Sequence, residues 1–297
     1  MPPHEILARA RAADSDLLST DRTLIAEAVA QLAQAEDAAG ALELMALTWR
    51  VWLAHDQIDL GSSLASAALS ARGAETVAPW RARALYADGL YAFRAGETER
   101  SKSRNAEALQ VARETRDPRG ECDALTGLAR VALREGRYDE VVRLARMARD
   151  RARESGDGAA EASPLHLEAA GVRLQQDYRA ARDLYLASLR LNGELGNPAS
   201  VAMEHHNLGW VELHIGDAAA AEAHFRERDA RSAPDAYGDA WTELNRAGVA
   251  ILREDWDDAN RRLESGTAAL ANLGSVLDPD DQFELDWLHE RLRTRTC

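Results

Sequence analysis

The stretch from His206 to Phe225, HNLGWVELHIGDAAAAEAHF, decides the fold. It carries a small residue at Gly209, a turn signal at Gly216 and a second small residue at Ala221. Comparable residues recur in steps of about 40 along the chain, and the turn position is occupied in succession by Asp56, Gly96, Gly136, Gln176, Gly216 and Glu254. A fixed period of this length is typical of a solenoid, in which supersecondary units stack on one another.

Each unit of the repeat has the signals of two helices. Asp117 precedes Pro118, which is the pattern of a capping residue followed by proline at the first helical position. The first helix then runs to the turn at Gly136, a second helix covers residues 138–154, and Gly156 closes it. No alternation typical of strands is present. The sequence therefore predicts an all-α protein with six helical hairpins over residues 38–275.

The two ends of the chain carry further helical patterns. Residues 1–37 contain two helical stretches, which we interpret as an N-terminal cap or a degenerate repeat. Residues 276–297 place Leu285, Leu288 and Leu292 on one helical face, as in a C-terminal capping helix that covers the last apolar surface of a solenoid. The complete prediction is a right-handed α-solenoid of about 14–15 antiparallel helices.

The repeat resembles the tetratricopeptide repeat (TPR). Seven residues before each turn stand Trp49, Gly89, Ala129, Ala169, Gly209 and Ala247, and five of these six are small. Small residues here let the two helices of a hairpin approach closely. The spacing is longer than the usual ~34 residues and is similar to the TPR arrays of bacterial LuxR- and SARP-type regulators. Trp49 and Arg228 depart from the pattern, which predicts altered packing near each of them.

Composition narrows the classes of partner. The net charge of −14 argues against non-specific binding to nucleic acid, which needs a basic surface. Two cysteines, Cys122 and Cys297, are too few for a disulfide framework or a zinc site. The chain begins without an apolar signal segment and has no apolar run of about 18 residues. We therefore expect a cytoplasmic protein with no membrane partner.

Motifs of catalysis and cofactor binding are missing. The sequence has no phosphate-binding loop, no nucleophile elbow, no dinucleotide fingerprint and no zinc-protease motif, so we expect neither an enzyme nor a cofactor. The spacing of His205, His206 and His214 does not suit metal ligands on one helix face. The acidic runs at residues 255–258 and 278–281 could hold a cation, but we interpret them as helix starts, which attract acids.

The TPR resemblance implies that the first helix of each hairpin lines a concave groove. The groove positions are occupied mainly by basic and aromatic residues, whereas acids are few there, with Glu43 and Asp123 as examples. The candidate partner-binding residues are Arg50, Arg83, Tyr86, Arg94, Arg130, Arg134, Arg173, His206, Asn207, Trp210, His214, Trp241 and Asn245.

This set favours a protein or peptide partner with an acidic segment. Arginine pairs with carboxylates in bidentate geometry, and Trp210 and Trp241 would be apolar anchors. In peptide-binding TPRs, which this repeat resembles, an asparagine at the position of Asn207 and Asn245 contacts the ligand backbone. The lysines of the carboxylate-clamp type of TPR are absent here. The alternative is that the arginines pair with neighbouring acids such as Glu135, or that the register is shifted by one residue.

Three functions remain open at this point. The first is a non-catalytic adaptor or scaffold that binds another protein in its groove. The second is a regulator that responds to a peptide or small molecule, similar to the TPR peptide receptors of Gram-positive bacteria, for which residues 1–37 are the only candidate effector element. The third is an enzyme or small-molecule binding protein inside a helical shell. Homo-oligomerisation is compatible with all three.

Overall fold

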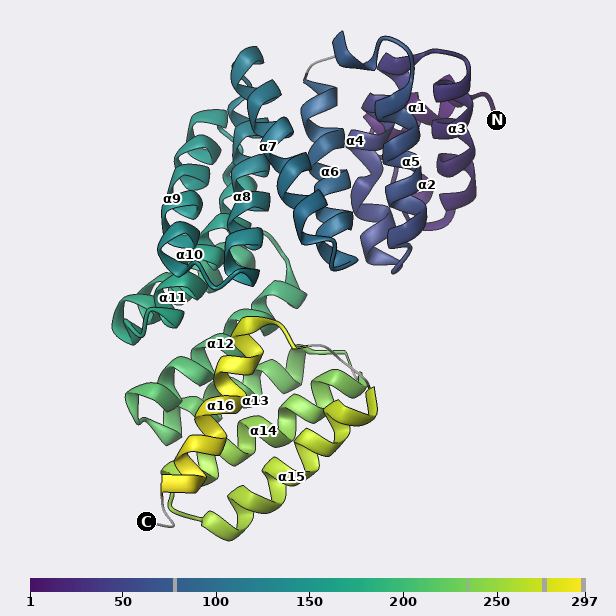
Figure 1. The fold of residues 1–297 in the computed structure, drawn as a ribbon. Helices are drawn as coiled ribbons and strands as arrows, with labels where there is room; N and C mark the ends of the chain where they lie inside the picture. The colour runs from purple at the N-terminus through teal and green to yellow at the C-terminus, as the bar shows by residue number, and fades with distance from the viewer. Residues whose placement is uncertain (77–78, 234, 274–276, 295–297) are drawn as a thin grey trace. The chain divides into compact units, whose positions relative to one another are not determined.

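The chain is helical throughout the residues described by the computed structural model, which are 1–297 without 77–78, 234, 274–276 and 295–297. These residues form sixteen α-helices and two short 3-10 turns, and no strand occurs among them (Figure 1). The all-α prediction is confirmed. The helix number exceeds the expected 14–15 because residues Ser15–Thr20 form a short helix of their own. No helix in the described parts of the chain is both long and apolar enough to span a membrane.

The helices fall into two compact units. The N-terminal unit comprises Met1–Val131 with Met147–Ala160, and the C-terminal unit comprises Ala132–Arg146 with Glu161 onward. The helices are α1 (Pro3–Arg11), α2 (Ser15–Thr20), α3 (Arg22–Gln34), α4 (Ala38–Ala54), α5 (Ile58–Ser70), α6 (Trp80–Arg94), α7 (Thr98–Thr115), α8 (Pro118–Arg134), α9 (Tyr138–Ser155), α10 (Ala162–Leu174), α11 (Tyr178–Glu194), α12 (Pro198–Ile215), α13 (Ala218–Arg231), α14 (Ala236–Leu252), α15 (Trp256–Leu273) and α16 (Pro279–Thr294). Helices α8 and α9 each contribute residues to both units.

The predicted turn residues all adopt the left-handed backbone conformation. Their φ angles are 54° at Asp56, 79° at Gly96, 70° at Gly136, 66° at Gln176, 97° at Gly216 and 59° at Glu254. Glycine enters this region without steric cost, whereas other residues lose roughly 1–2 kcal/mol there. The repeat therefore keeps its turn geometry even in the three units where glycine is replaced.

The capping signals around the third hairpin are also confirmed. The backbone N–H of Arg119 donates to the Asp117 carboxylate at 3.1 Å, and α8 begins at Pro118. Helix α9 covers Tyr138–Ser155 and is followed by Gly156 with φ of 72°. Sequence and structure thus agree on both boundaries of this second helix to within one residue.

Small residues let the helices of a hairpin come close together. A Cβ atom added to Gly209 would lie 2.3 Å from a ring carbon of Phe225, so the aromatic ring packs directly on the glycine. Ala129 and Ala169 are fully buried at the same register position. In the first hairpin, Thr48 is the fully buried residue and Trp49 beside it is half-buried, which is the altered packing expected there.

The departure at Arg228 also has a structural role. Its guanidinium donates to the Gly238 carbonyl at 3.0 Å and to the Thr242 hydroxyl at 2.7 Å, and it pairs with Asp229 at 2.8 Å. These contacts join the end of α13 to the start of α14. Cys122 is buried as a free thiol, and Cys297 lies outside the described residues.

Candidate functional site

The first helices of the N-terminal unit bring together arginine and aromatic side chains. The Arg50 guanidinium lies 4.1 Å from the ring centroid of Trp49, and the rings of Trp49 and Tyr86 meet edge to face with centroids 5.5 Å apart. Arg130 donates to the Tyr86 hydroxyl at 3.2 Å. We call this surface the N-terminal arginine face and define it by six residues from α4, α6 and α8: Trp49, Arg50, Arg83, Tyr86, Asp123 and Arg130.

The acids predicted among these helices are already neutralised. Asp123 pairs with Arg119 at 3.2 Å, and Glu43 accepts two hydrogen bonds of 2.6 Å from Arg11. Burial raises the pKa of the Asp123 carboxyl, while the positive charges of Arg119, Arg50 and Arg83 act in the opposite direction. These charges reach Asp123 from three different helices, which places Arg50 and Arg83 close to the same carboxyl group.

Four of the candidate arginines in this unit lack an ion-pair partner within 4 Å in the described parts of the chain. Among the described residues, Arg50, Arg83, Arg94 and Arg130 form no ion pair within 4 Å, and Arg50 and Arg94 are exposed. Arg83 lies over the Trp80 ring at 5.2 Å, and its buried Nε has no hydrogen-bond partner within the described chain. The face therefore carries an excess of positive charge next to the half-buried ring of Trp49.

The first helices of the C-terminal unit are covered by α16. Figure 1 shows this yellow helix lying over α12 and α14, and it also contacts α10 and α15. The ring of Trp287 packs edge to face on Trp210 at 6.0 Å, and Phe283 lies 5.5 Å from His214. The predicted capping helix thus contacts the last hairpin and also extends along the surface expected to line a groove.

Acidic residues of α16, and Asp278 just before it, contact basic residues of this covered surface. Glu284 forms an ion pair with Arg173, and its second oxygen lies 2.7 Å from His214 Nε2. Arg173 is also 3.6 Å from Asp280. The Tyr237 hydroxyl donates to Asp281, and Arg134 lies 3.4 Å from Asp278. The acidic run at 278–281, expected only as a helix start, therefore faces Arg134, Arg173 and Tyr237.

Five predicted groove residues are buried in the C-terminal unit: Arg173, Asn207, Trp210, Trp241 and Asn245. Trp210 and Trp241 are 0% and 2% exposed and belong to the core, and Arg173 and Asn245 are equally inaccessible. They do not form exposed anchors in this structure, because α16 and neighbouring helices cover them. The Asn207 amide donates to the Met203 carbonyl within its own helix.

His206 is held neutral by its surroundings. Burial lowers the pKa of His206 to about 3, and the charges of Arg228 and Arg173 act in the same direction. The Asn245 amide lies 3.4 Å from His206 Nδ1, which fits an unprotonated nitrogen as the acceptor. These two predicted groove residues contact each other instead of lying free.

A cavity of about 350 Å³ opens beside the first turn of α16. Its wall combines basic and polar groups of the first helices with four carboxylates of the C-terminal segment. The lining includes His166, Arg173, Met203, His206, Asn207, Arg228, Tyr237, Trp241, Asp278, Asp280, Asp281 and Glu284. The covered surface therefore has a polar opening beside the acidic residues at the start of α16.

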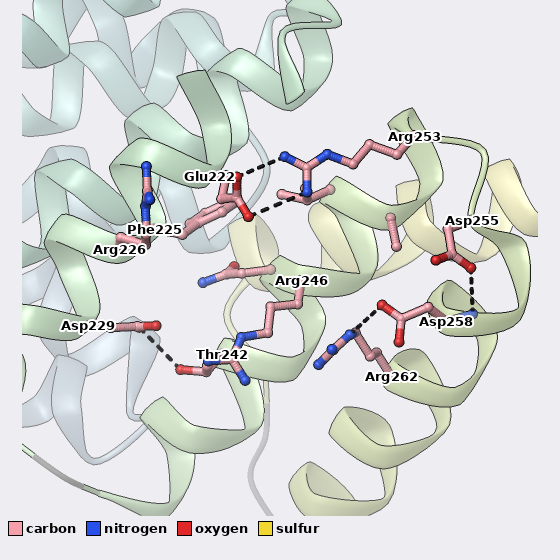
Figure 2. A pocket seen from close by; sticks show the side chains of 13 residues that line it. Glu222, Phe225, Arg226, Asp229, Thr242, Arg246, Arg253, Asp255, Asp258 and Arg262 are labelled. Carbon is pink, nitrogen blue, oxygen red and sulfur yellow. Dashed lines mark hydrogen bonds and ion pairs between the residues drawn. The ribbon is translucent and has the colours of Figure 1, made fainter. Parts of the chain in front are cut away.

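A second pocket of about 360 Å³ lies among α13, α14 and α15 (Figure 2). Its charged groups are largely paired: Arg253 with Glu222 at 2.8 Å, and Arg262 with Asp258 at 2.7 Å. Asp229 accepts a hydrogen bond from the Thr242 hydroxyl at 3.2 Å. These pairs leave little uncompensated charge to attract a ligand, and the sequence patterns did not single this pocket out.

Comparison with known proteins identifies the type of fold. No protein-family model and no curated protein matches the sequence. Among solved structures, a Rap protein complexed with Competence and Sporulation Factor has a TM-score of 0.62 at 14% identity, with 99% of this chain and 88% of that chain covered. The chain has a TPR-like fold.

Two further solved structures have a similar architecture. BtubC (BKLC) from P. vanneervenii has a TM-score of 0.57 at 18% identity, covering 75% of this chain and 91% of that one. A tetratricopeptide repeat protein from Parabacteroides merdae has a TM-score of 0.54 at 12% identity, covering 96% and 99%. Identities this low establish the architecture alone.

Proposed function

We propose that the protein is a non-catalytic scaffold that binds an acidic segment of another protein on its N-terminal arginine face. One observation carries this proposal. In the C-terminal unit, an acidic helix of the chain itself lies on the corresponding first helices, with Glu284 against Arg173 and His214. The N-terminal face has unpaired arginines of the same kind and no covering helix among the described residues.

The chemistry of the N-terminal arginine face suits such a segment. Arg50 is exposed and held over Trp49, so its guanidinium is oriented before a ligand arrives. A planar guanidinium pairs with carboxylates through two parallel hydrogen bonds. The half-buried ring of Trp49 adds aromatic surface of the type that is enriched at the centres of protein interfaces, and the buried ring of Tyr86 supports it edge to face. An acidic segment with at least one apolar side chain fits this combination.

Site-specific photo-crosslinking tests the proposed function. A photo-reactive phenylalanine analogue is placed at Trp49, in the face, or at Gln110, an exposed position on α7. Both variants are irradiated in cells of the source organism, and the cross-linked peptides are sequenced by mass spectrometry. We expect acid-rich segments of one partner at position 49 and none at position 110. Equal cross-linking at both positions would contradict the proposal.

A ligand-responsive regulator is the second candidate. The observation in its favour is α16, which lies on a surface that the repeat leaves available for binding. The resemblance to LuxR- and SARP-type arrays also favours a regulatory role, and the Rap neighbour was solved in complex with Competence and Sporulation Factor. A regulator of this kind would change the exposure of α16 when its ligand binds, which hydrogen exchange measures directly.

A further inference from the structure

Helix α16 is attached to the C-terminal unit by few buried side chains. Of its sixteen residues only Glu284 and Leu288 are buried, and the remaining apolar contacts, such as those of Trp287, are partial. The seventeen-residue helix α14 beneath it buries nine residues, including Trp241 and Leu244. Segments with few buried apolar contacts open at lower free energy than the core to which they are attached.

The polar groups beneath α16 also contribute little net stabilisation. Glu284 and Arg173 are both buried, and a buried ion pair gives weak net stabilisation because both charges lose their hydration. Buried nitrogens of Arg173 (Nε) and Trp210 (Nε1) have no hydrogen-bond partner in the described chain. The carboxyls of Asp278, Asp280 and Asp281 stand close together at the start of the helix, and their charges repel one another.

We propose that the surface beneath α16 is a binding site for an acidic amphipathic helix of a partner protein, and that α16 is an internal occupant which this helix displaces. This inference shares with the proposed function only the idea that the protein binds acidic segments. It concerns the surface beneath α16 and not the N-terminal arginine face. The occupant is specified by charge complementarity, because Arg134, Arg173 and His214 all meet acids of the C-terminal segment.

The contacts of α16 define the sequence that the partner helix needs. Its first turn carries acids, and a glutamate one turn further inward reaches Arg173 and His214, as Glu284 does. Aromatic residues stand at the positions of Phe283 and Trp287, four residues apart on one face. A leucine follows at the position of Leu288, which is fully buried. A partner helix that also accepts hydrogen bonds from Arg173 Nε and Trp210 Nε1 would bind more tightly than α16 does.

Competition by a peptide in trans tests this inference. A fluorescent peptide with the sequence of residues 277–294 is titrated into the full-length protein and into its Leu288→Ala and Glu290→Ala variants. Leu288 is buried whereas Glu290 is exposed, so only the first variant weakens the internal helix. We expect the peptide to bind the Leu288→Ala variant at least tenfold more tightly than the other two proteins. Equal affinities for all three would overturn the proposal.

A control peptide and a control variant show where the peptide binds. The peptide carrying Glu284→Lys should lose at least tenfold in affinity, because lysine would face Arg173 and His214. Binding of the native peptide should be unchanged by Arg50→Glu with Arg130→Glu, which alters only the N-terminal arginine face. Binding that these two substitutions abolish would place the peptide on that face, supporting the proposed function and contradicting this inference.

Hydrogen exchange gives a readout that needs no variant. In the native full-length protein, amides in the last three turns of α16 should exchange at least tenfold faster than those in the buried part of α14. Saturating peptide should remove the remaining protection from α16 alone. If α16 is protected as strongly as α14, it is a fixed part of the fold and the proposal fails, whatever the Leu288→Ala variant does.

Discussion

The first helices of the two units are exposed to different degrees. In the N-terminal unit, Trp49 is half-buried and Arg50 and Arg130 have no acid partner. In the C-terminal unit, Trp210 and Arg173 are buried, and Arg173 is paired with acids of the chain's own last helix. In the C-terminal unit, α16, a segment outside the repeat, and neighbouring helices cover these residues. The segments that pack on the first helices thus decide whether a row of groove residues becomes an accessible surface or part of the core.

The largest expected effect compares the two tryptophans. Trp210→Ala removes a fully buried ring that packs on Phe225, Trp241 and Trp287, and should destabilise the protein by ~3–5 kcal/mol. Trp49→Ala removes a half-buried ring and should cost roughly 1 kcal/mol. Denaturant unfolding followed by circular dichroism measures both. Equal losses would mean that the N-terminal face is as much a core as the C-terminal one.

A smaller effect tests whether the hairpins themselves pack alike in the two units. Ala129→Leu in the N-terminal unit and Ala169→Leu in the C-terminal unit each overfill a fully buried position and should cost about 1–3 kcal/mol. Ala67→Leu, at an exposed position on α5, is the matched control and should cost less than about 0.5 kcal/mol. Wild-type stability in both buried variants would show that the register used for the repeat is incorrect.

The pH dependence of α16 sharpens the comparison further. Burial raises the pKa of Asp281 from 3.8 to about 7, and the charges of Asp280 and Asp278 add to the rise, whereas Arg173 and the hydrogen bond from Tyr237 oppose it. A carboxyl whose pKa is raised in the docked state holds its proton better there. The docked helix is therefore favoured at low pH and loses stability as the pH rises from about 4 to about 7.

Hydrogen exchange at pH 5 and pH 8, corrected for the intrinsic rate, measures this effect. The protection of α16 should fall by about tenfold or more between the two values. Asp281→Asn keeps an acceptor for Tyr237 without a charge, and should abolish most of the fall. The protection of the N-terminal unit serves as the internal reference and should stay constant. A variant that keeps the full pH dependence would assign it to other groups.

Local signals in the sequence were sufficient for the repeat. The turn residues from Asp56 to Glu254, the cap at Asp117 and the small residues around Gly209 act within one hairpin, and each is recognisable from its neighbours. Arg50, Tyr86 and Arg130, which the register assigns to the groove, lie close together around Trp49, which the register assigns to the small interior position. These predictions succeed because turn geometry and helix packing are determined over short distances in the chain.

The position of α16 was not predictable in the same way. Its acids at 278–281 resemble an ordinary helix start, and its leucines resemble an ordinary cap. The contact between Arg173 and Glu284 joins residues 111 positions apart, and no periodic pattern reports such a pairing. The available signal was the coincidence of an arginine-bearing face with an acidic, amphipathic segment elsewhere in the chain. Weighing these two features together would have suggested an internal ligand.

Binding of an acidic partner on the N-terminal arginine face can be measured directly. The direct test is the affinity of the full-length protein for the segment found by cross-linking, before and after Arg50→Glu with Arg130→Glu. Arg72→Glu with Arg113→Glu, two exposed arginines of the same unit outside the face, is the control. Neither double variant should change the free energy of unfolding by more than about 1–2 kcal/mol, because Arg50, Arg72 and Arg113 are exposed and Arg130 contributes one hydrogen bond, to Tyr86.

We expect at least about a tenfold loss of affinity at low salt for Arg50→Glu with Arg130→Glu, and a weaker dependence of binding on salt. The control variant should bind as the wild type does. Unchanged affinity and salt dependence in the Arg50→Glu, Arg130→Glu variant would show that the acidic partner does not bind on the N-terminal arginine face.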